Sequence, residues 1–93
     1  MIEIKKIDSG FGIGVKLQNA NFLLISAKKG YIMCGYLNME TAEKLGDVAC
    51  IVTGVKTFED VLKAKVVRVS KSARALGLKE GITGKEALDL LSA

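Results

Sequence analysis

The sequence predicts an α+β protein: a mixed β-sheet with an antiparallel N-terminal β-region, followed by β-α-β-α-β units and C-terminal helices. Two observations lead to this class. Before residue 38, apolar residues recur with the period of strands, and turn-forming residues separate the apolar runs. From Asn38 onward, short apolar runs alternate with segments of helical period that begin at capping residues. We expect these helices to pack on the sheet.

Four strands are expected in the N-terminal part. Residues 2–7 form the first strand, and a turn containing Asp and Gly leads into the second, over residues 11–17. In that second strand large apolar residues alternate strictly with glycine or lysine, which predicts a half-buried strand with a nearly bare second face. Residues 22–27 and 31–37 are apolar on both faces, so we expect them to form a central hairpin.

The C-terminal part is predicted from capping signals. Each expected helix begins at a residue whose side chain accepts backbone N–H bonds: Asn38, Thr57, Ser70 and Thr83. Gly46 and Gly77 stand where the first and third of these helices should end, and Glu86 completes a capping box with Thr83. Strands over residues 48–53 and 65–69 separate the helices. Because strand and helix alternate, we expect right-handed parallel crossovers here.

Composition narrows the chemistry by exclusion. We expect one domain over residues 1–93, with residues 1–21 as an N-terminal β-region and residues 22–93 as an α/β core. The chain has no His, which excludes Ser-His-Asp and Cys-His catalysis and His-ligated metal sites. Its two cysteines are too few for a structural zinc site, so we expect no metal and no cofactor.

The N-terminus does not read as a signal peptide, and the longest apolar runs fall far short of the ~20 residues that a membrane helix needs. We therefore expect a cytoplasmic protein with reduced thiols and no membrane partner. The formal net charge is +4, and the basic run from Lys63 to Arg74 could bind an anionic partner. No aromatic residue follows Phe58, however, so the sequence disfavours nucleic-acid binding.

Four segments carry a family resemblance. They read KGYIMCGYLN at residues 29–38, EKLGDVA at 43–49, VTGVKTFED at 52–60 and GITGKEAL at 81–88. They resemble the YunC-like domain-of-unknown-function family of bacteria and archaea, and the likeness extends over nearly the whole chain. The resemblance implies that the N-terminal β-structure is a tetramerisation region. It implies no catalytic residue.

Two glycine motifs are weak signals for nucleotides. Gly10, Gly12 and Gly14 lack the G-x-G-x-x-G spacing and are followed by another strand, so we interpret them as a strand that lets another backbone or subunit come close. The segment GITGKE resembles the end of a phosphate-binding loop, but Glu86 replaces the Ser or Thr that such a loop needs for magnesium.

The candidate ligand site follows from topology. In parallel βαβ units the carboxyl ends of the strands share one edge with the helix starts, and ligands tend to bind there. We expect three junctions to meet at this edge, at residues 35–38, 53–57 and 70–72. The residues expected to bind a small anion are Gly35, Asn38, Thr53, Gly54, Lys56 and Thr57. The alternative is that these residues only cap helices and form turns. The sequence leaves this open because helix capping and anion binding use the same free backbone N–H groups.

Cys34 is the candidate for catalysis. It lies where a strand hands over to a helix, and a helix start can activate a thiol. Without His, activation would have to come from Lys28, Lys29, Lys56 or backbone amides. The alternative is an ordinary buried strand cysteine, which is the interpretation we also give to Cys50.

Self-association is the remaining expectation. Mean hydropathy is +0.31, which is high for a chain with so little interior. At least one of the first two strands should be a sheet edge, which invites pairing with another chain. The predicted interface residues are Phe11, Gly12, Ile13, Gly14 and Val15. The sequence therefore predicts a homo-oligomer, by resemblance a tetramer, that acts as a ligand-binding or regulatory module; the alternative is a small enzyme that uses Cys34.

Overall fold

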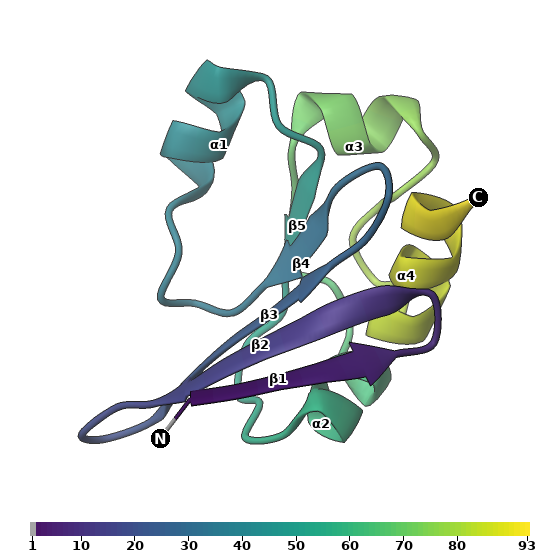
Figure 1. Ribbon diagram of the computed structural model, residues 1–93. Helices are drawn as coiled ribbons and strands as arrows, with labels where there is room; N and C mark the ends of the chain where they lie inside the picture. Colours follow the sequence, from purple (N-terminus) through teal and green to yellow (C-terminus); the bar gives the residue numbers. More distant parts are fainter. Residues whose placement is uncertain (1) are drawn as a thin grey trace.

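A six-stranded mixed sheet forms the centre of the computed structural model, which describes residues 2–93, and its strands lie in the order β1-β2-β3-β4-β5-β6 (Figure 1). The strands are β1 (Ile2–Ile7), β2 (Gly10–Lys16), β3 (Asn21–Ser26), β4 (Tyr31–Met33), β5 (Ala49–Ile51) and β6 (Arg68–Val69). The helices are α1 (Met39–Leu45), α2 (Phe58–Lys63), α3 (Lys71–Ala75) and α4 (Gly84–Ser92). The predicted α+β class is confirmed.

The N-terminal half is the expected antiparallel region. β1 pairs with β2, β2 with β3 and β3 with β4, each antiparallel, so β3 and β4 form the predicted central hairpin. β1 lies at one edge of the sheet, as expected for one of the first two strands. β4 is shorter than predicted because the chain turns after Met33, and residues 34–38 lead into α1.

Of the expected parallel crossovers, the one between β4 and β5 is present and the one between β5 and β6 is not. β4 and β5 are parallel and α1 connects them, but β6 runs antiparallel to β5, so the expectation of a second parallel crossover is wrong. The packing of α2 explains the difference. Its Phe58 lies against Gly12 on β2, and its Val61 carbonyl lies against Gly84 at the start of α4. α2 therefore packs under β2 and beside α4, and not along β5 as the helix of a parallel crossover from β5 to β6 would.

The inner face of the sheet carries the larger core. Buried side chains from β3, β4 and β5 pack there with residues of α2, α3 and α4, and Ile25, Ile32, Leu88 and Leu91 have no exposed surface. A smaller core lies on the outer face, where α1 covers β4 and β5. Met33 and Ile51 belong to this second cluster.

The outer face of β1, β2 and β3 has no helix over it within residues 2–93. Ile2 and Ile4 on β1 lie opposite Val15 and Ile13 on β2, so all four side chains share this face. Ile2 is 71% exposed, Ile4 72% and Phe11 55%. We call this surface, which continues onto β3, the outer apolar face; it consists of Ile2, Ile4, Phe11, Ile13, Val15, Phe22 and Leu24.

The glycines of β2 face the other way. A Cβ atom built on Gly12 would lie 2.7 Å from Cε1 of Phe58, so the glycine makes room for a ring of its own chain. The interpretation that the glycine face admits another backbone or subunit is therefore wrong. Of the five predicted interface residues, Phe11, Ile13 and Val15 point outward, whereas Gly12 and Gly14 are buried on the inner side.

Candidate functional site

The carboxyl ends of β4 and β5 lie side by side because the two strands are parallel. The N–H of Val52 donates to the carbonyl of Met33 at 3.0 Å, so the pairing continues to the point where both strands end. Two of the three predicted junctions, residues 35–38 and 53–57, begin here. A Cβ on Gly35 would come within 3.9 Å of Thr53, which shows how closely the two loops approach.

The third predicted junction lies elsewhere. The hydroxyl of Ser70 donates to the carbonyl of Asp47 at 2.7 Å and accepts from the N–H of Ala49 at 3.1 Å. Both partners lie at the amino end of β5, so residues 70–72 are at the opposite end of the sheet from Thr53. The expectation that three helix starts converge is wrong because β6 runs antiparallel.

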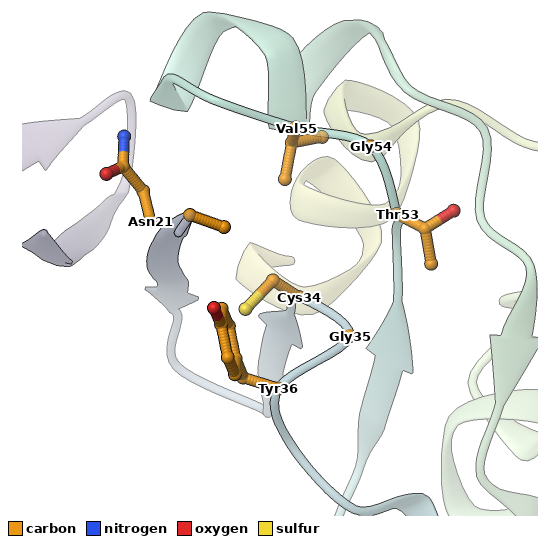
Figure 2. Close-up of a pocket in the computed structure, with 8 residues that line it drawn as sticks. Asn21, Cys34, Gly35, Tyr36, Thr53, Gly54 and Val55 are labelled. Carbon is orange, nitrogen blue, oxygen red and sulfur yellow. The ribbon is translucent and has the colours of Figure 1, made fainter. Parts of the chain in front are cut away.

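A cavity of about 330 Å³ opens at the shared strand ends (Figure 2). We call it the strand-end pocket, and its lining residues are Ala20, Asn21, Cys34, Gly35, Tyr36, Thr53, Gly54 and Val55. In Figure 2 the sulfur of Cys34 points toward the side where the ring of Tyr36 lies. The side chain of Thr53 points away from Cys34 and Tyr36. The pocket thus combines one thiol, one phenol and mainly apolar walls.

The surroundings of the two cysteines differ. Cys34 is 4% exposed, and its Sγ accepts a hydrogen bond from the N–H of Leu23 at 3.4 Å. Cys50 lies inside β5 with no exposed surface, and burial raises the pKa of its thiol to about 12. Cys50 is therefore a core residue, as interpreted from the sequence.

The bases proposed to activate Cys34 are not in the pocket. Lys28 and Lys29 lie in the turn between β3 and β4, which is at the amino end of β4. Lys56 lines a neighbouring cavity and not this one. No Lys, Arg, Asp or Glu is among the residues that line the strand-end pocket. Of the activators proposed for Cys34, a backbone amide, that of Leu23, is the one that bonds its sulfur.

Several of the backbone amides near this edge are bonded within the chain. The side chain of Asn38 accepts from the N–H groups of Glu40 and Thr41. The carboxylate of Asp60 accepts from the N–H of Lys56 at 3.0 Å, and the hydroxyl of Thr57 accepts from the N–H of Asp60. Asn38 and Thr57 thus act as the caps that the alternative interpretation proposed.

A second cavity of about 420 Å³ adjoins the first. We call it the loop pocket because its walls are the β2–β3 loop and the loop from β5 to α2; the lining residues are Lys16, Leu17, Gln18, Asn19, Ala20, Asn21, Gly54, Val55 and Lys56. The side-chain amide of Asn21 donates to the carbonyl of Lys56 at 2.9 Å and joins the two loops. Of the predicted anion-binding residues, Gly54 lines both pockets, Gly35 and Thr53 line the first, and Lys56 lines the second.

Sequence reasoning missed several lining residues. Asn21 begins β3, and because β3 runs antiparallel to β4, this end of β3 lies beside the carboxyl end of β4. Tyr36 lies within the predicted junction at residues 35–38, and an aromatic residue directly after Gly35 at a strand end was a signal that could have identified it. Within residues 2–93, no three His, Cys, Asp or Glu side chains are grouped so that they could hold a metal ion.

Comparison with known proteins places the chain in a family. The family model described as a domain of unknown function, DUF1805, matches residues 33–91. The chain belongs to the DUF1805 family. It is similar to the uncharacterized protein YunC of Bacillus subtilis strain 168, at 39% identity over 80 residues, which cover 82% of this chain and 79% of that protein.

A solved structure also resembles this DUF1805 chain. It is the crystal structure of TA1206, a protein of unknown function from Thermoplasma acidophilum, with a TM-score of 0.89 and 42% identity. The match covers 99% of this chain and 92% of that one, so the N-terminal strands are included. The resemblance inferred from the sequence is confirmed. In addition, none of the helices that the structure describes is long and apolar enough to cross a membrane.

Proposed function

We propose that this DUF1805 protein is a small-molecule-binding module whose ligand occupies the strand-end pocket. The observation that supports this most directly is the position of the pocket, outside the carboxyl ends of two adjacent parallel strands. Open α/β sheets bind their ligands at such edges. The size of about 330 Å³ and the mainly apolar lining are also typical of small-molecule sites.

Binding is a better proposal than catalysis at this site. General acid–base chemistry needs a titratable group within reach of the reacting atom. The lining offers only Cys34 and Tyr36 as such groups, with no carboxylate or amine to pair with them. The Cys34 enzyme remains the alternative, and it requires a base that the ligand or a second chain would have to bring.

Binding in the strand-end pocket can be tested by NMR with benzyl alcohol as an uncharged apolar probe. We expect its addition to shift the backbone amide signals of Gly35, Tyr36, Gly54 and Val55. Replacing Val55→Phe should fill the cavity and abolish these shifts, whereas Val67→Phe, at an exposed position outside the pocket, should leave them. Shifts confined to other surfaces of the wild-type protein would rule out this function.

We also propose that the protein works as a homo-oligomer, with a tetramer favoured. The outer apolar face supports this proposal, because single exposed apolar residues are common on proteins but contiguous apolar patches mark contact sites. β1 adds a sheet edge next to this face. Closed symmetry makes a dimer, or a dimer of dimers, the expected form.

A further inference from the structure

The strand-end pocket and the loop pocket adjoin each other, and we call the two together the groove. Ala20, Asn21, Gly54 and Val55 belong to the lining of both cavities. The groove runs from Cys34 and Tyr36 at one end to the loops around residues 16–19 and Lys56 at the other. A ligand larger than either cavity could therefore extend through both.

The two halves of the groove differ in charge. The strand-end half is lined by no charged side chain, whereas the loop half adds Lys16 and Lys56 and no carboxylate. The ion pairs seen within residues 2–93 involve Arg74 and Lys85, so neither of these two lysines is neutralised in that way. One end of the groove thus suits an apolar group and the other suits a negative charge.

The lysines are held in the same region by the backbone. Lys16 ends β2, and Lys56 lies in the loop before α2, far apart in the sequence. The hydrogen bond from the Asn21 amide to the Lys56 carbonyl fixes the spacing of the two loops. The N–H of Lys56 is bonded to the Asp60 carboxylate. The formal positive charges in the lining of the loop pocket are the two ammonium groups of Lys16 and Lys56.

We propose that the ligand is an amphipathic anion, with a small apolar body in the strand-end pocket and a carboxylate or phosphate monoester in the loop pocket. Lys16 and Lys56 pair with the anionic group, and the walls formed by Val55 and Tyr36 contact the apolar body. This inference rests on the proposed binding function and adds the class of ligand to it. Lys16 is a new site residue that sequence reasoning did not identify.

Four probes separate the two halves of the ligand: phenyl phosphate, phenylacetate, benzyl alcohol and inorganic phosphate. In NMR titrations at low ionic strength, we expect the two aromatic anions to bind about tenfold more tightly than either benzyl alcohol or inorganic phosphate. They should shift the amides of Gly54 and Val55, which belong to both pockets. Added salt should weaken the binding of the aromatic anions and leave the binding of benzyl alcohol unchanged.

The decisive variant is the double substitution Lys16→Gln with Lys56→Gln. It should reduce the affinity for both aromatic anions to that for benzyl alcohol, whose own binding should not change. The control, Lys5→Gln with Lys63→Gln, removes the same charge from exposed positions outside both pockets and should bind as the wild type does.

Each contrary outcome has a distinct meaning. Equal affinity for phenylacetate, phenyl phosphate and benzyl alcohol would overturn the amphipathic anion while leaving the pocket function intact. Inorganic phosphate binding as tightly as phenyl phosphate would overturn it too, because the apolar body would then contribute nothing. If no aromatic probe shifts the pocket amides, the proposed function fails, and this inference fails with it.

Discussion

At the scale of single residues, the two thiols are distinguished by what lies around each sulfur. Cys34 borders a cavity, whereas Cys50 is sealed in the core with a pKa raised to about 12 by burial. Because the thiolate is the reactive form, Cys50 should be inert at neutral pH for as long as the protein is folded.

We predict that brief treatment with iodoacetamide labels Cys34 before Cys50. Mass spectrometry of the digested protein measures the two sites separately, and a sample unfolded in urea, in which both thiols should react alike, serves as the control. Equal labelling of the folded protein, or faster labelling of Cys50, would contradict the ranking.

Gly12 is the residue on which the packing of α2 depends. We predict that Gly12→Ala lowers the free energy of unfolding by about 1–3 kcal/mol, the usual cost of overpacking a core, because the new methyl group would meet the Phe58 ring. Urea denaturation measures the change. Adding Phe58→Leu should recover part of the loss, since the two side chains are in contact.

Gly35→Ala is the matched control for Gly12→Ala. At Gly35 a Cβ atom would meet only Thr53, at the ordinary contact distance of 3.9 Å, so little stability should be lost. If the two variants were equally stable, Phe58 would not be packed on β2 as described.

At the scale of elements, local signals predicted where helices begin and end. Asn38, Thr57, Ser70 and Thr83 all cap the helices that follow them, because an N-cap needs only a side-chain oxygen next to nearby N–H groups. The direction of β6 could not be predicted in this way. It depends on Phe58 and Val61 packing against β2 and α4, which are distant in the sequence.

The same reasoning explains the candidate site. Gly35, Thr53 and Gly54 were predicted to come together because the parallel pairing of β4 and β5 follows from the helix between them. The prediction that Ser70 lies at the same edge was wrong because β6 runs antiparallel to β5. The inward orientation of Gly12 was also beyond the sequence, since alternation along a strand reveals two faces but not which of them the helices cover.

The capping box of α4 gives a prediction about this element. The side chain of Thr83 accepts from the N–H of Glu86, and the Glu86 carboxylate accepts from the N–H of Thr83 at 3.0 Å. We expect Thr83→Ala to cost about 1 kcal/mol of stability in urea denaturation at pH 7. Thr41→Ala, at an exposed position in α1, is the control and should cost less.

The same box should make stability depend on acid pH. Hydrogen bonds from the backbone N–H and the hydroxyl of Thr83 lower the pKa of Glu86. A carboxylate whose pKa is lowered by folding stabilises the folded state fully when the pH is above the pKa of an unfolded Glu, about 4.3. This stabilisation is lost as the pH falls through the lower pKa of the folded state. Glu86→Gln should therefore show a smaller loss of stability below about pH 4 than the wild type. If Glu86→Gln left the dependence of stability on acid pH unchanged, the Glu86 carboxylate would not stabilise the capping box.

At the scale of the whole molecule, the sheet is protected unevenly. Three helices cover its inner face, and α1 covers β4 and β5 on the outer side (Figure 1). The outer side chains of β1 to β3 are exposed or half-buried. A domain this small has limited interior, so covering that surface with a second copy would bury apolar area that the monomer cannot.

We therefore predict that the protein is an oligomer at micromolar concentration, with a mass well above the 9.9 kDa of one chain. Light scattering coupled to gel filtration measures this mass directly. Phe11→Asp combined with Ile13→Asp should dissociate the oligomer, because each introduces a charge that would be buried in the interface. Leu76→Asp is the control; it places the same charge at the end of α3, away from the outer apolar face, and should leave the mass unchanged. A wild-type mass near 9.9 kDa would refute self-association, and an oligomer that survives the double substitution would place its interface on another surface.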